Sequence, residues 1–312
     1  MDIKNASDWP RVAVMGAGAV GSYFGGMLAR GGAPVTLVHR RAHVEAIARD
    51  GLFLDTIHFQ ERVAVGASTQ PEAARDADLV LFSVKTLDTE AAARLLAPHL
   101  KPGAIVLSLQ NGVDNIGRIR AAAGIEAVPA VVYVAVAMPA PGHVKHTGRG
   151  DLVIGGASRD ALEFVATTFA RAGVPCRISE NIEGELWSKL VWNCAGNALT
   201  ALTRATYGQV ARNAATQQVL LAAANEVRDV ARATGVQLPS PDTAAVRLKL
   251  AHDLGEATSS TAQDIARGKR TEIDALNGFV ARRGAQLGVP TPVNHTLYAL
   301  VKLLEENLPG NQ

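Results

Sequence analysis

The fold of this 312-residue chain follows from the stretch Arg11-Val12-Ala13-Val14-Met15-Gly16-Ala17-Gly18-Ala19-Val20-Gly21. Its apolar residues predict a strand, and its three glycines have the spacing G-x-G-x-x-G. A helical pattern follows over residues 22–30, and a second strand is expected over residues 34–38. This order of strand, tight turn, helix and strand favours a dinucleotide-binding unit over a glycine-rich turn that only reverses the chain.

Each glycine of the motif has a separate physical role. Gly16 permits the tight turn, Gly18 lets the backbone approach a pyrophosphate, and Gly21 lets the helix pack closely on the strand. The start of the helix adds unpaired N–H groups and the positive end of the helix dipole. We therefore expect the cofactor phosphates to bind along the loop at Gly16, Ala17, Gly18, Ala19, Val20 and Gly21.

The residues after the second expected strand indicate which dinucleotide binds. An acidic residue there usually binds the ribose 2′-hydroxyl of NAD, whereas this chain has His39-Arg40-Arg41. A carboxylate would repel a 2′-phosphate, and a guanidinium binds one through two charge-assisted hydrogen bonds. We therefore predict NADPH rather than NADH. The alternative is that the arginines are solvated charges at the start of the next helix.

Composition limits the classes of function. The chain is 48% hydrophobic and 19% charged, and 31 basic residues nearly balance 29 acidic ones, for a net charge of +2. This balance gives no reason to expect a nucleic-acid or membrane partner. Its two cysteines, Cys176 and Cys194, have neither metal-ligand nor disulfide spacing. No signal peptide or apolar run of about 20 residues is visible, so a cytoplasmic location is expected.

Two later apolar runs predict strands of a parallel sheet that are buried on both faces. They cover residues 78–84 and 104–109, and they end at Lys85 and Asn111. Ligands of open parallel sheets bind at the carboxyl ends of the strands. Lys85 and Asn111 should therefore lie on the ligand side.

The first domain is completed by further expected elements. Helices are predicted over residues 42–49, 87–100 and 161–172. Strands are predicted over residues 51–55 and 61–65 as a pair, over 128–138, 144–147 and 151–154 as a mixed and partly antiparallel edge, and over 174–178.

A second domain begins near residue 181, after which no strand pattern occurs. Helices are expected over residues 183–202, 214–234, 243–253, 260–266, 272–287 and 292–305. The predicted fold class is therefore α/β, with a Rossmann-type dinucleotide-binding domain over residues 9–180 and an all-helical substrate and catalytic domain over residues 181–312.

A polar face is expected on the first helix of the second domain. Lys189, Asn193 and Asn197 are four residues apart, so successive members are rotated by only about 40° and share a face. A lone lysine there would be a solvated residue. Three aligned polar groups bordered by apolar side chains favour a binding site.

Residues 259–274 form a second polar stretch. Thr271 and Asp274 resemble a capping box, which would place Glu272 in the first turn of the following helix. The alternatives are that Glu272 is a surface charge that compensates the helix dipole and that Ser260 is an N-cap.

These motifs together resemble the ketopantoate reductase (2-dehydropantoate 2-reductase) family. The resemblance covers residues 11–304 and rests on Gly16-x-Gly18-x-x-Gly21, Asn111-Gly112, Glu185-Leu186-Trp187-x-Lys189-Leu190-x-x-Asn193-x-x-x-Asn197, Ser259-Ser260-x-x-Gln263-Asp264 and Thr271-Glu272-Ile273-Asp274-x-x-Asn277-Gly278. The family reduces ketopantoate to pantoate with NADPH, on the way to pantothenate and coenzyme A. Its members have a Rossmann domain and a helical domain, with the active site in the cleft between them.

The resemblance implies a role for each site residue. Lys189 would be the general acid, and Glu272 would hold the substrate hydroxyl, orient Lys189 and lie among the cofactor-binding residues. Substrate would bind Asn193, Asn197 and Ser260, Asn111 would lie between nicotinamide and substrate, and Arg40 and Lys85 would contact the 2′-phosphate region. One departure is Ala198, where the family pattern often has proline.

Proton donation by a lysine agrees with the chemistry of the reaction. Hydride transfer to a ketone places negative charge on oxygen, which a nearby ammonium stabilises and protonates. No metal cluster or Ser-His-Asp spacing offers a competing reaction. A reductase of another 2-oxo acid and a non-catalytic NADPH-binding regulator remain as alternatives. The sequence does not fix the oligomeric state, for which a homodimer is one candidate.

Overall fold

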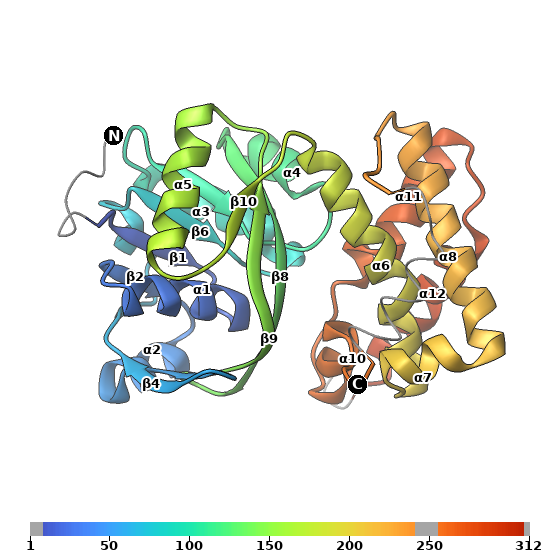
Figure 1. Cartoon of the computed structure of the whole chain (residues 1–312), viewed down its shortest axis with the longest axis horizontal. Coiled ribbons are helices and arrows are strands. Elements are labelled where there is room, and N and C mark those ends of the chain that lie inside the picture. Colours follow the sequence, from blue (N-terminus) through green and yellow to red (C-terminus); the bar gives the residue numbers. More distant parts are fainter. Residues whose placement is uncertain (1–8, 241–254, 309–312) are drawn as a thin grey trace. The chain divides into compact units, whose positions relative to one another are not determined.

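The computed structural model describes residues 9–240 and 255–308. The chain divides into two compact units, unit 1 over Met1–Ile182 and unit 2 over Glu183–Gln312. Figure 1 labels the elements of both units. The division falls at the start of helix α6 (Ile182–Thr203), two residues after the domain limit expected from sequence.

Unit 1 is built on one large sheet with the strand order β4-β3-β9-β8-β7-β6-β1-β2-β5, and β10 pairs with β9. Its strands are β1 (Val12–Met15), β2 (Val35–Val38), β3 (Leu52–Asp55), β4 (Gln60–Val63), β5 (Gly66–Ser68), β6 (Leu79–Phe82), β7 (Ile105–Ser108), β8 (Ala127–Ala140), β9 (His143–Ile154) and β10 (Cys176–Ile178). Its helices are α1 (Ala19–Arg30), α2 (Arg41–Asp50), α3 (Thr89–Leu96), α4 (Asn115–Ala123) and α5 (Arg159–Arg171).

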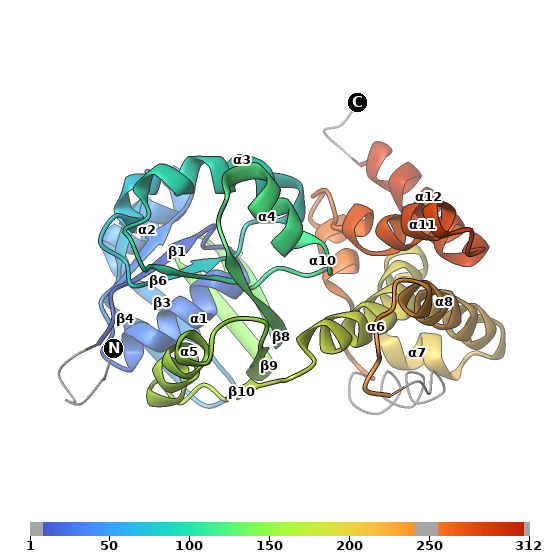
Figure 2. The ribbon, with the colours of Figure 1, turned by 90° about the horizontal axis from the view of Figure 1, so that it is seen from above.

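The central strands are apolar throughout because both of their faces are covered. Along β1, Val12 and Val14 pack in a core with α1 and α5, whereas Ala13 and Met15 pack in a second core with α3 and α4. This alternation is the period of two of a strand. Figure 2 shows α3 and α4 on one side of the strands and α1 and α5 on the other. The expected Rossmann-type architecture is confirmed.

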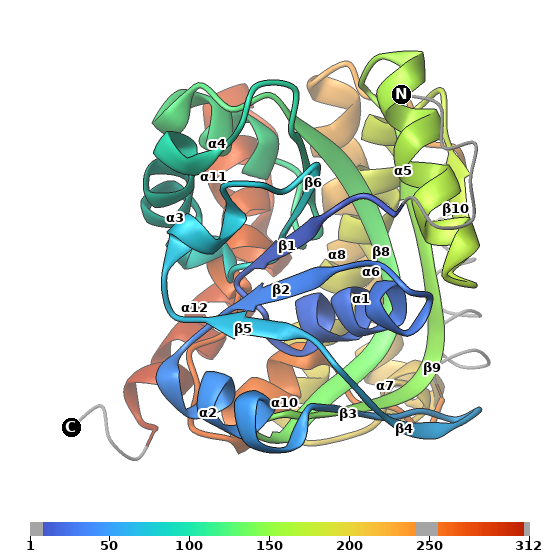
Figure 3. The same ribbon diagram turned by 90° about the vertical axis from the view of Figure 1, so that its left-hand side faces the viewer.

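The far edge of the sheet is mixed, as predicted. β8 and β9 pair antiparallel with register shifts, and β9 pairs parallel with both β3 and β10. The predicted strand pair at residues 51–55 and 61–65 is β3 and β4, which are antiparallel. β5 and α4 were not predicted. Figure 3 shows β5 beside β2, with β1 on the other side of β2 and α1 lying across these strands.

Over residues 183–240 and 255–308, the regular elements of unit 2 are all helices joined by turns and loops. Besides α6 it contains α7 (Tyr207–Arg212), α8 (Ala214–Ala233), α10 (Ser260–Ala266), α11 (Asn277–Leu287) and α12 (Pro292–Glu306). The sequence did not predict α7. The expected helix over residues 243–253 lies outside the described residues.

The predicted helix over residues 272–287 is wrong at its start. A short 3₁₀ turn spans Ile273–Ala275, Leu276 has non-helical dihedral angles (φ −105°, ψ −107°), and α11 begins only at Asn277. The expected capping box is also wrong, because Thr271 Oγ1 accepts from the Ile273 N–H and the Asp274 carboxylate accepts from Tyr298 and Lys302. Glu272 therefore lies just before a 3₁₀ turn and not within the first turn of an α-helix.

Candidate functional site

The glycine-rich loop joins β1 to α1 and is held from several sides. Gly16 has φ +84°, and a Cβ there would come within 2.7 Å of the backbone nitrogen of Val84. A Cβ at Gly21 would meet Val14 Cγ1 at 2.8 Å and also the Ser83 hydroxyl. The tight turn and the close helix packing expected at these two glycines are therefore confirmed.

Gly18 differs from the other two glycines because the space beside it is open. A Cβ there would find only the Gly16 carbonyl, at 3.9 Å. Gly18 is the N-cap of α1, and the first turn of this helix contains no acidic residue. The exposed N–H groups and the helix dipole thus meet an open space without a competing carboxylate, which fits a pyrophosphate.

The other expected cofactor residues follow neighbouring strands of the same sheet. Arg40 lies two residues beyond β2, Lys85 three residues beyond β6, and Asn111 three residues beyond β7. The strands are adjacent and parallel in the order β7-β6-β1-β2, so these residues and the glycine-rich loop lie along one edge. Arg40 is exposed and is the N-cap residue of α2.

Sequence reasoning missed the polar network that supports Asn111. The Gln110 side chain is 7% exposed and donates to the Val84 carbonyl at 3.1 Å and to the Thr89 hydroxyl at 2.8 Å. Asn115 Nδ2 donates to the Asn111 carbonyl at 2.7 Å. These contacts fix the end of β7 against the end of β6. The signal available in the sequence was an amide directly after a buried strand.

A buried histidine, which no sequence pattern indicated, also supports the glycine-rich loop. His43 is 3% exposed, and its Nδ1 accepts from the Gly142 N–H at 2.9 Å. Its Nε2 must then carry the proton and donate to Ser22 Oγ at 3.2 Å, while Ser22 donates to the Ala17 carbonyl at 2.7 Å. Burial, with the neighbouring His39 ring, lowers the pKa of His43 to about 4, which keeps this imidazole neutral.

The three polar residues expected on one face of α6 differ in burial. Lys189 and Asn193 are half-buried, whereas the side chain of Asn197 is only 3% exposed. Asn197 Oδ1 accepts a hydrogen bond from the Tyr207 hydroxyl at 2.7 Å. Lys189 and Asn193 are thus more accessible than Asn197, whose side chain is held by Tyr207 of the same unit.

The segment that carries Glu272 is attached to α6. Asn277 Nδ2 donates to the Cys194 carbonyl at 3.0 Å, and the Trp187 and Phe279 rings pack edge to face at 5.9 Å. Glu272 itself is half-buried. These contacts attach the first turn of α11 to α6 at Trp187 and Cys194, and Glu272 lies five residues before Asn277.

The two serines before α10 have different surroundings. Ser259 is 1% exposed and is the N-cap, since its hydroxyl accepts from the Ala262 N–H at 3.0 Å. Ser260 is exposed and is the first residue of α10. The alternative reading of Ser260 as an N-cap is therefore wrong, and its hydroxyl is accessible.

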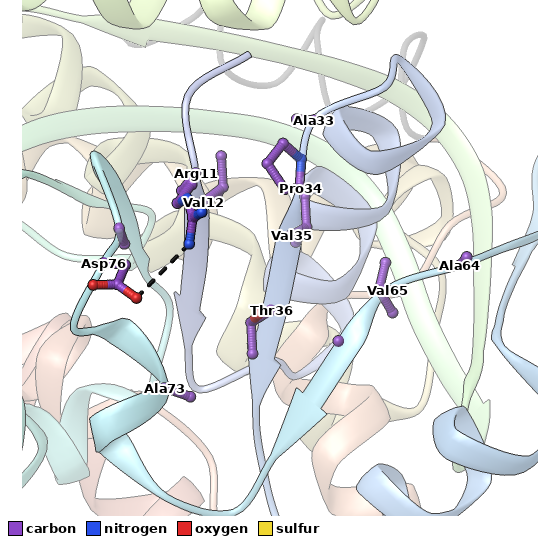
Figure 4. Close-up of a pocket in the computed structure, with 12 residues that line it drawn as sticks. Arg11, Val12, Ala33, Pro34, Val35, Thr36, Ala64, Val65, Ala73 and Asp76 are labelled. Atoms are coloured by element: carbon purple, nitrogen blue, oxygen red, sulfur yellow. Dashed lines mark ion pairs between the residues drawn. The ribbon is translucent and has the colours of Figure 1, made fainter. Parts of the chain in front are cut away.

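One pocket of about 510 Å³ lies at the opposite edge of the sheet, where β1, β2 and β5 begin (Figure 4). An ion pair between Arg11 and Asp76, at 3.7 Å, borders it. The residues of the glycine-rich loop do not line it, so this pocket is separate from the expected cofactor site.

Within residues 9–240 and 255–308, no group of three or more histidine, cysteine, aspartate or glutamate side chains could hold a metal ion. None of the helices described combines the length and apolar character that a membrane crossing requires.

Comparison with known proteins assigns the family. The family model described as ketopantoate reductase PanE/ApbA matches residues 12–159, and the model of its C-terminal domain matches residues 181–305. A 2-dehydropantoate 2-reductase of Archaeoglobus fulgidus is 36% identical over 301 residues, which are 96% of this chain and 99% of that protein.

Solved structures agree with this assignment. A PanE/ApbA family ketopantoate reductase from Ralstonia eutropha JMP134 has a TM-score of 0.91 and 51% identity, over 96% of this chain and 99% of that one. D-mandelate dehydrogenase in a ternary structure with NADH and anilino(oxo)acetate has a TM-score of 0.89 and 25% identity, over 96% and 99%. The chain therefore belongs to the ketopantoate reductase family, a family of oxidoreductases.

Proposed function

We propose that this protein reduces ketopantoate to pantoate with NADPH, a step toward pantothenate and coenzyme A in the cytoplasm. One observation carries the proposal. Lys189 and Asn193 are half-buried and one turn apart on α6, and the hydrogen bond from Asn277 to Cys194 ties α11, which follows the segment of Glu272, to the same helix. An ammonium, an amide and a carboxylate together match what a 2-oxo acid needs for binding and protonation.

The residues of unit 1 would bind the dinucleotide. Gly16, Gly18 and Gly21 with the start of α1 would bind the pyrophosphate, and Arg40 would bind the 2′-phosphate that distinguishes NADPH. Lys85 would add a second positive charge to that region, and Asn111 would lie near the nicotinamide. A bound NADPH would supply the hydride.

The residues of unit 2 would bind and protonate the substrate. The carbonyl carbon gains the hydride, and the carbonyl oxygen gains a proton from the Lys189 ammonium, so the ketone becomes an alcohol. Asn193, Asn197 and Ser260 would donate hydrogen bonds to the carboxylate and hydroxyl oxygens. Glu272 would accept a hydrogen bond from the substrate hydroxyl and keep Lys189 protonated and oriented.

A second candidate is the reduction of another 2-oxo acid. The likeness to D-mandelate dehydrogenase favours it, because that protein was solved with anilino(oxo)acetate, which is a 2-oxo acid derivative with an aromatic substituent. The motifs define the chemistry of the reaction more closely than they define the side chain of the acid.

A substrate panel at fixed NADPH tests both candidates. Oxidation of NADPH, followed by absorbance, should be fastest with ketopantoate and slower with phenylglyoxylate and unbranched 2-oxo acids. A preference for phenylglyoxylate would support the second candidate. Oxidation with none of these acids, together with normal NADPH binding, would reject both and favour a non-catalytic cofactor-binding protein.

A further inference from the structure

Three separate segments of unit 2 converge on Asn197. This residue belongs to α6, its side chain meets Tyr207 at the start of α7, and its carbonyl accepts from the Ser259 hydroxyl at 3.2 Å. The Thr200 hydroxyl lies 2.7 Å from Ser259 Oγ and closes the group. All four residues are buried, with exposures of 8% or less.

The chain around Tyr207 is fixed by backbone contacts as well. The Tyr207 N–H donates to the Ala257 carbonyl at 3.0 Å, and the Gly208 N–H donates to the Gly255 carbonyl at 2.9 Å. A Cβ at Gly208 would come within 2.7 Å of that Gly255 oxygen. Glycine is therefore required for this close approach, and the phenol of Tyr207 has little freedom to move.

The contact with Tyr207 orients the Asn197 amide, because the phenol hydroxyl donates to Oδ1 at 2.7 Å. Burial raises the pKa of Tyr207, so the phenol keeps its proton. A phenol that donates to Asn197 must meet the carbonyl oxygen of that amide and not its NH₂ group. Oδ1 is thereby occupied, and Nδ2 is turned away from Tyr207.

Nothing among the described residues uses the freed amide nitrogen. No hydrogen bond from Asn197 Nδ2 to a described residue is present, and this atom is not among the fully buried polar atoms that lack a partner. The residue as a whole is 3% exposed. Its neighbours one and two turns earlier on the helix are Asn193 and Lys189.

We propose that Tyr207 is a positioning residue that fixes Asn197 as a hydrogen-bond donor, so that this subsite accepts only an oxygen acceptor of the 2-oxo acid. The inference rests on the proposed function. Without the phenol hydroxyl, the amide could rotate and present Oδ1, which would repel a carboxylate. Ser259 contributes by holding the same turn of α6 and by starting α10, where Ser260 lies.

Tyr207→Phe removes the hydroxyl and keeps the ring. The KM for the 2-oxo acid should rise about 3- to 10-fold, the equivalent of one neutral hydrogen bond. The kcat and the Kd for NADPH should change by no more than about twofold, the usual error of such comparisons. Thr203→Val is the matched control, because its hydroxyl also lies on α6 but bonds only at the end of that helix.

The same substitution made in an Asn197→Ala background separates positioning from general loss of structure. Tyr207→Phe should have no further effect on KM there, because the amide that it orients is absent. A rise in KM of the same size in both backgrounds would overturn the proposal, and so would an unchanged KM for Tyr207→Phe. A wild-type protein that reduces no 2-oxo acid would reject the proposed function and the proposal with it.

Asn197→Asp gives a second test if Tyr207→Phe does not fold. Aspartate has nearly the same shape and can still accept from Tyr207, but an ionised carboxylate has no hydrogen to donate. The KM of Asn197→Asp for the 2-oxo acid should rise by more than about tenfold. The variant loses the hydrogen bond to the substrate, and its carboxylate also repels the substrate carboxylate. A KM within about twofold of the wild-type value would overturn the donor role of Asn197.

Discussion

The backbone N–H and the side-chain hydroxyl of Thr271 both donate to one carboxylate oxygen of Glu305, each at 2.6 Å. Glu305 is 4% exposed, and its other oxygen accepts from Lys302 at 3.0 Å. Thr271 precedes Glu272 in the chain, so α12 fixes the backbone at the position from which Glu272 extends. Burial opposes the charge of Lys302, but its hydrogen bonds with Glu305 and Asp274 raise its pKa overall.

The first prediction concerns Glu305→Gln. The amide oxygen can still accept from Thr271, but without a charge, so the free energy of unfolding should fall by about 1–2 kcal/mol. The reductase kcat should also fall, because weaker hydrogen bonds to Thr271 hold the backbone before Glu272 less firmly. Urea unfolding and steady-state kinetics would measure both effects. Glu306→Gln, at an exposed glutamate one residue later, is the control and should change neither.

The second prediction concerns the pH dependence of stability and His43. The pKa of this imidazole is about 4 in the folded protein and about 6.5 in the unfolded chain, so the unfolded state binds more protons between these values. Stability should therefore be lost as the pH falls through this range. Between about pH 7 and pH 5 the loss should be about 2 kcal/mol from this residue alone.

His43→Gln should remove that part of the pH dependence. Urea unfolding at the two pH values would compare the wild-type protein, His43→Gln and His58→Gln, in which an exposed histidine is replaced. The first variant should be less stable at neutral pH but lose less on acidification. Equal pH dependence in all three proteins would show that His43 is not buried as a neutral imidazole.

The third prediction concerns cofactor selectivity at Arg40. Loss of one charge-assisted hydrogen bond costs about 1.5–3 kcal/mol, so Arg40→Ala should narrow the preference for NADPH over NADH by about ten- to a hundredfold. Fluorescence titration with each cofactor would measure it. Arg49→Ala, at an exposed arginine near the other end of α2, should leave the ratio unchanged. If the wild-type protein binds both cofactors equally, Arg40 has been given the wrong role.

The sequence predicted the central sheet and the long helices because each has its own local signal. The apolar runs of β1, β6 and β7 are covered on both faces, and the ends of α6 and α12 lie within one residue of the predicted ones. Elements that depend on distant partners were missed or misplaced. The start of α11 was misplaced because Thr271 bonds to Glu305, which lies 34 residues later in the chain.

The residues of the candidate site also fall into those with a local sequence signal and those that depend on distant partners. The glycines, Arg40 and Lys189 could be proposed as site residues from the sequence, because their chemistry or spacing singles them out. Gln110, Ser259 and Tyr207 could not, because a buried amide, serine or tyrosine resembles any core residue until its partners are known. The sequence therefore indicates reacting groups better than it indicates the groups that position them.

The fourth prediction tests the central claim, which is that Lys189 is the general acid. Lys189→Ala should lose at least about a hundredfold in kcat, because general acid catalysis typically contributes that much or more. Lys189→Arg should not restore the rate, since a guanidinium is longer, planar and a weaker acid. Lys269→Ala, at an exposed lysine of unit 2, serves as the control.

The most direct measurement is the single-turnover rate of NADPH oxidation at saturating ketopantoate, for wild-type protein and for Lys189→Ala. We expect a loss of at least about a hundredfold in this rate, with the thermal midpoint and the Kd for NADPH nearly unchanged. The wild-type rate should also fall at high pH as Lys189 loses its proton, and the Lys189→Ala variant should not show this decrease. A folded Lys189→Ala protein with near-normal turnover would show that Lys189 is not the general acid.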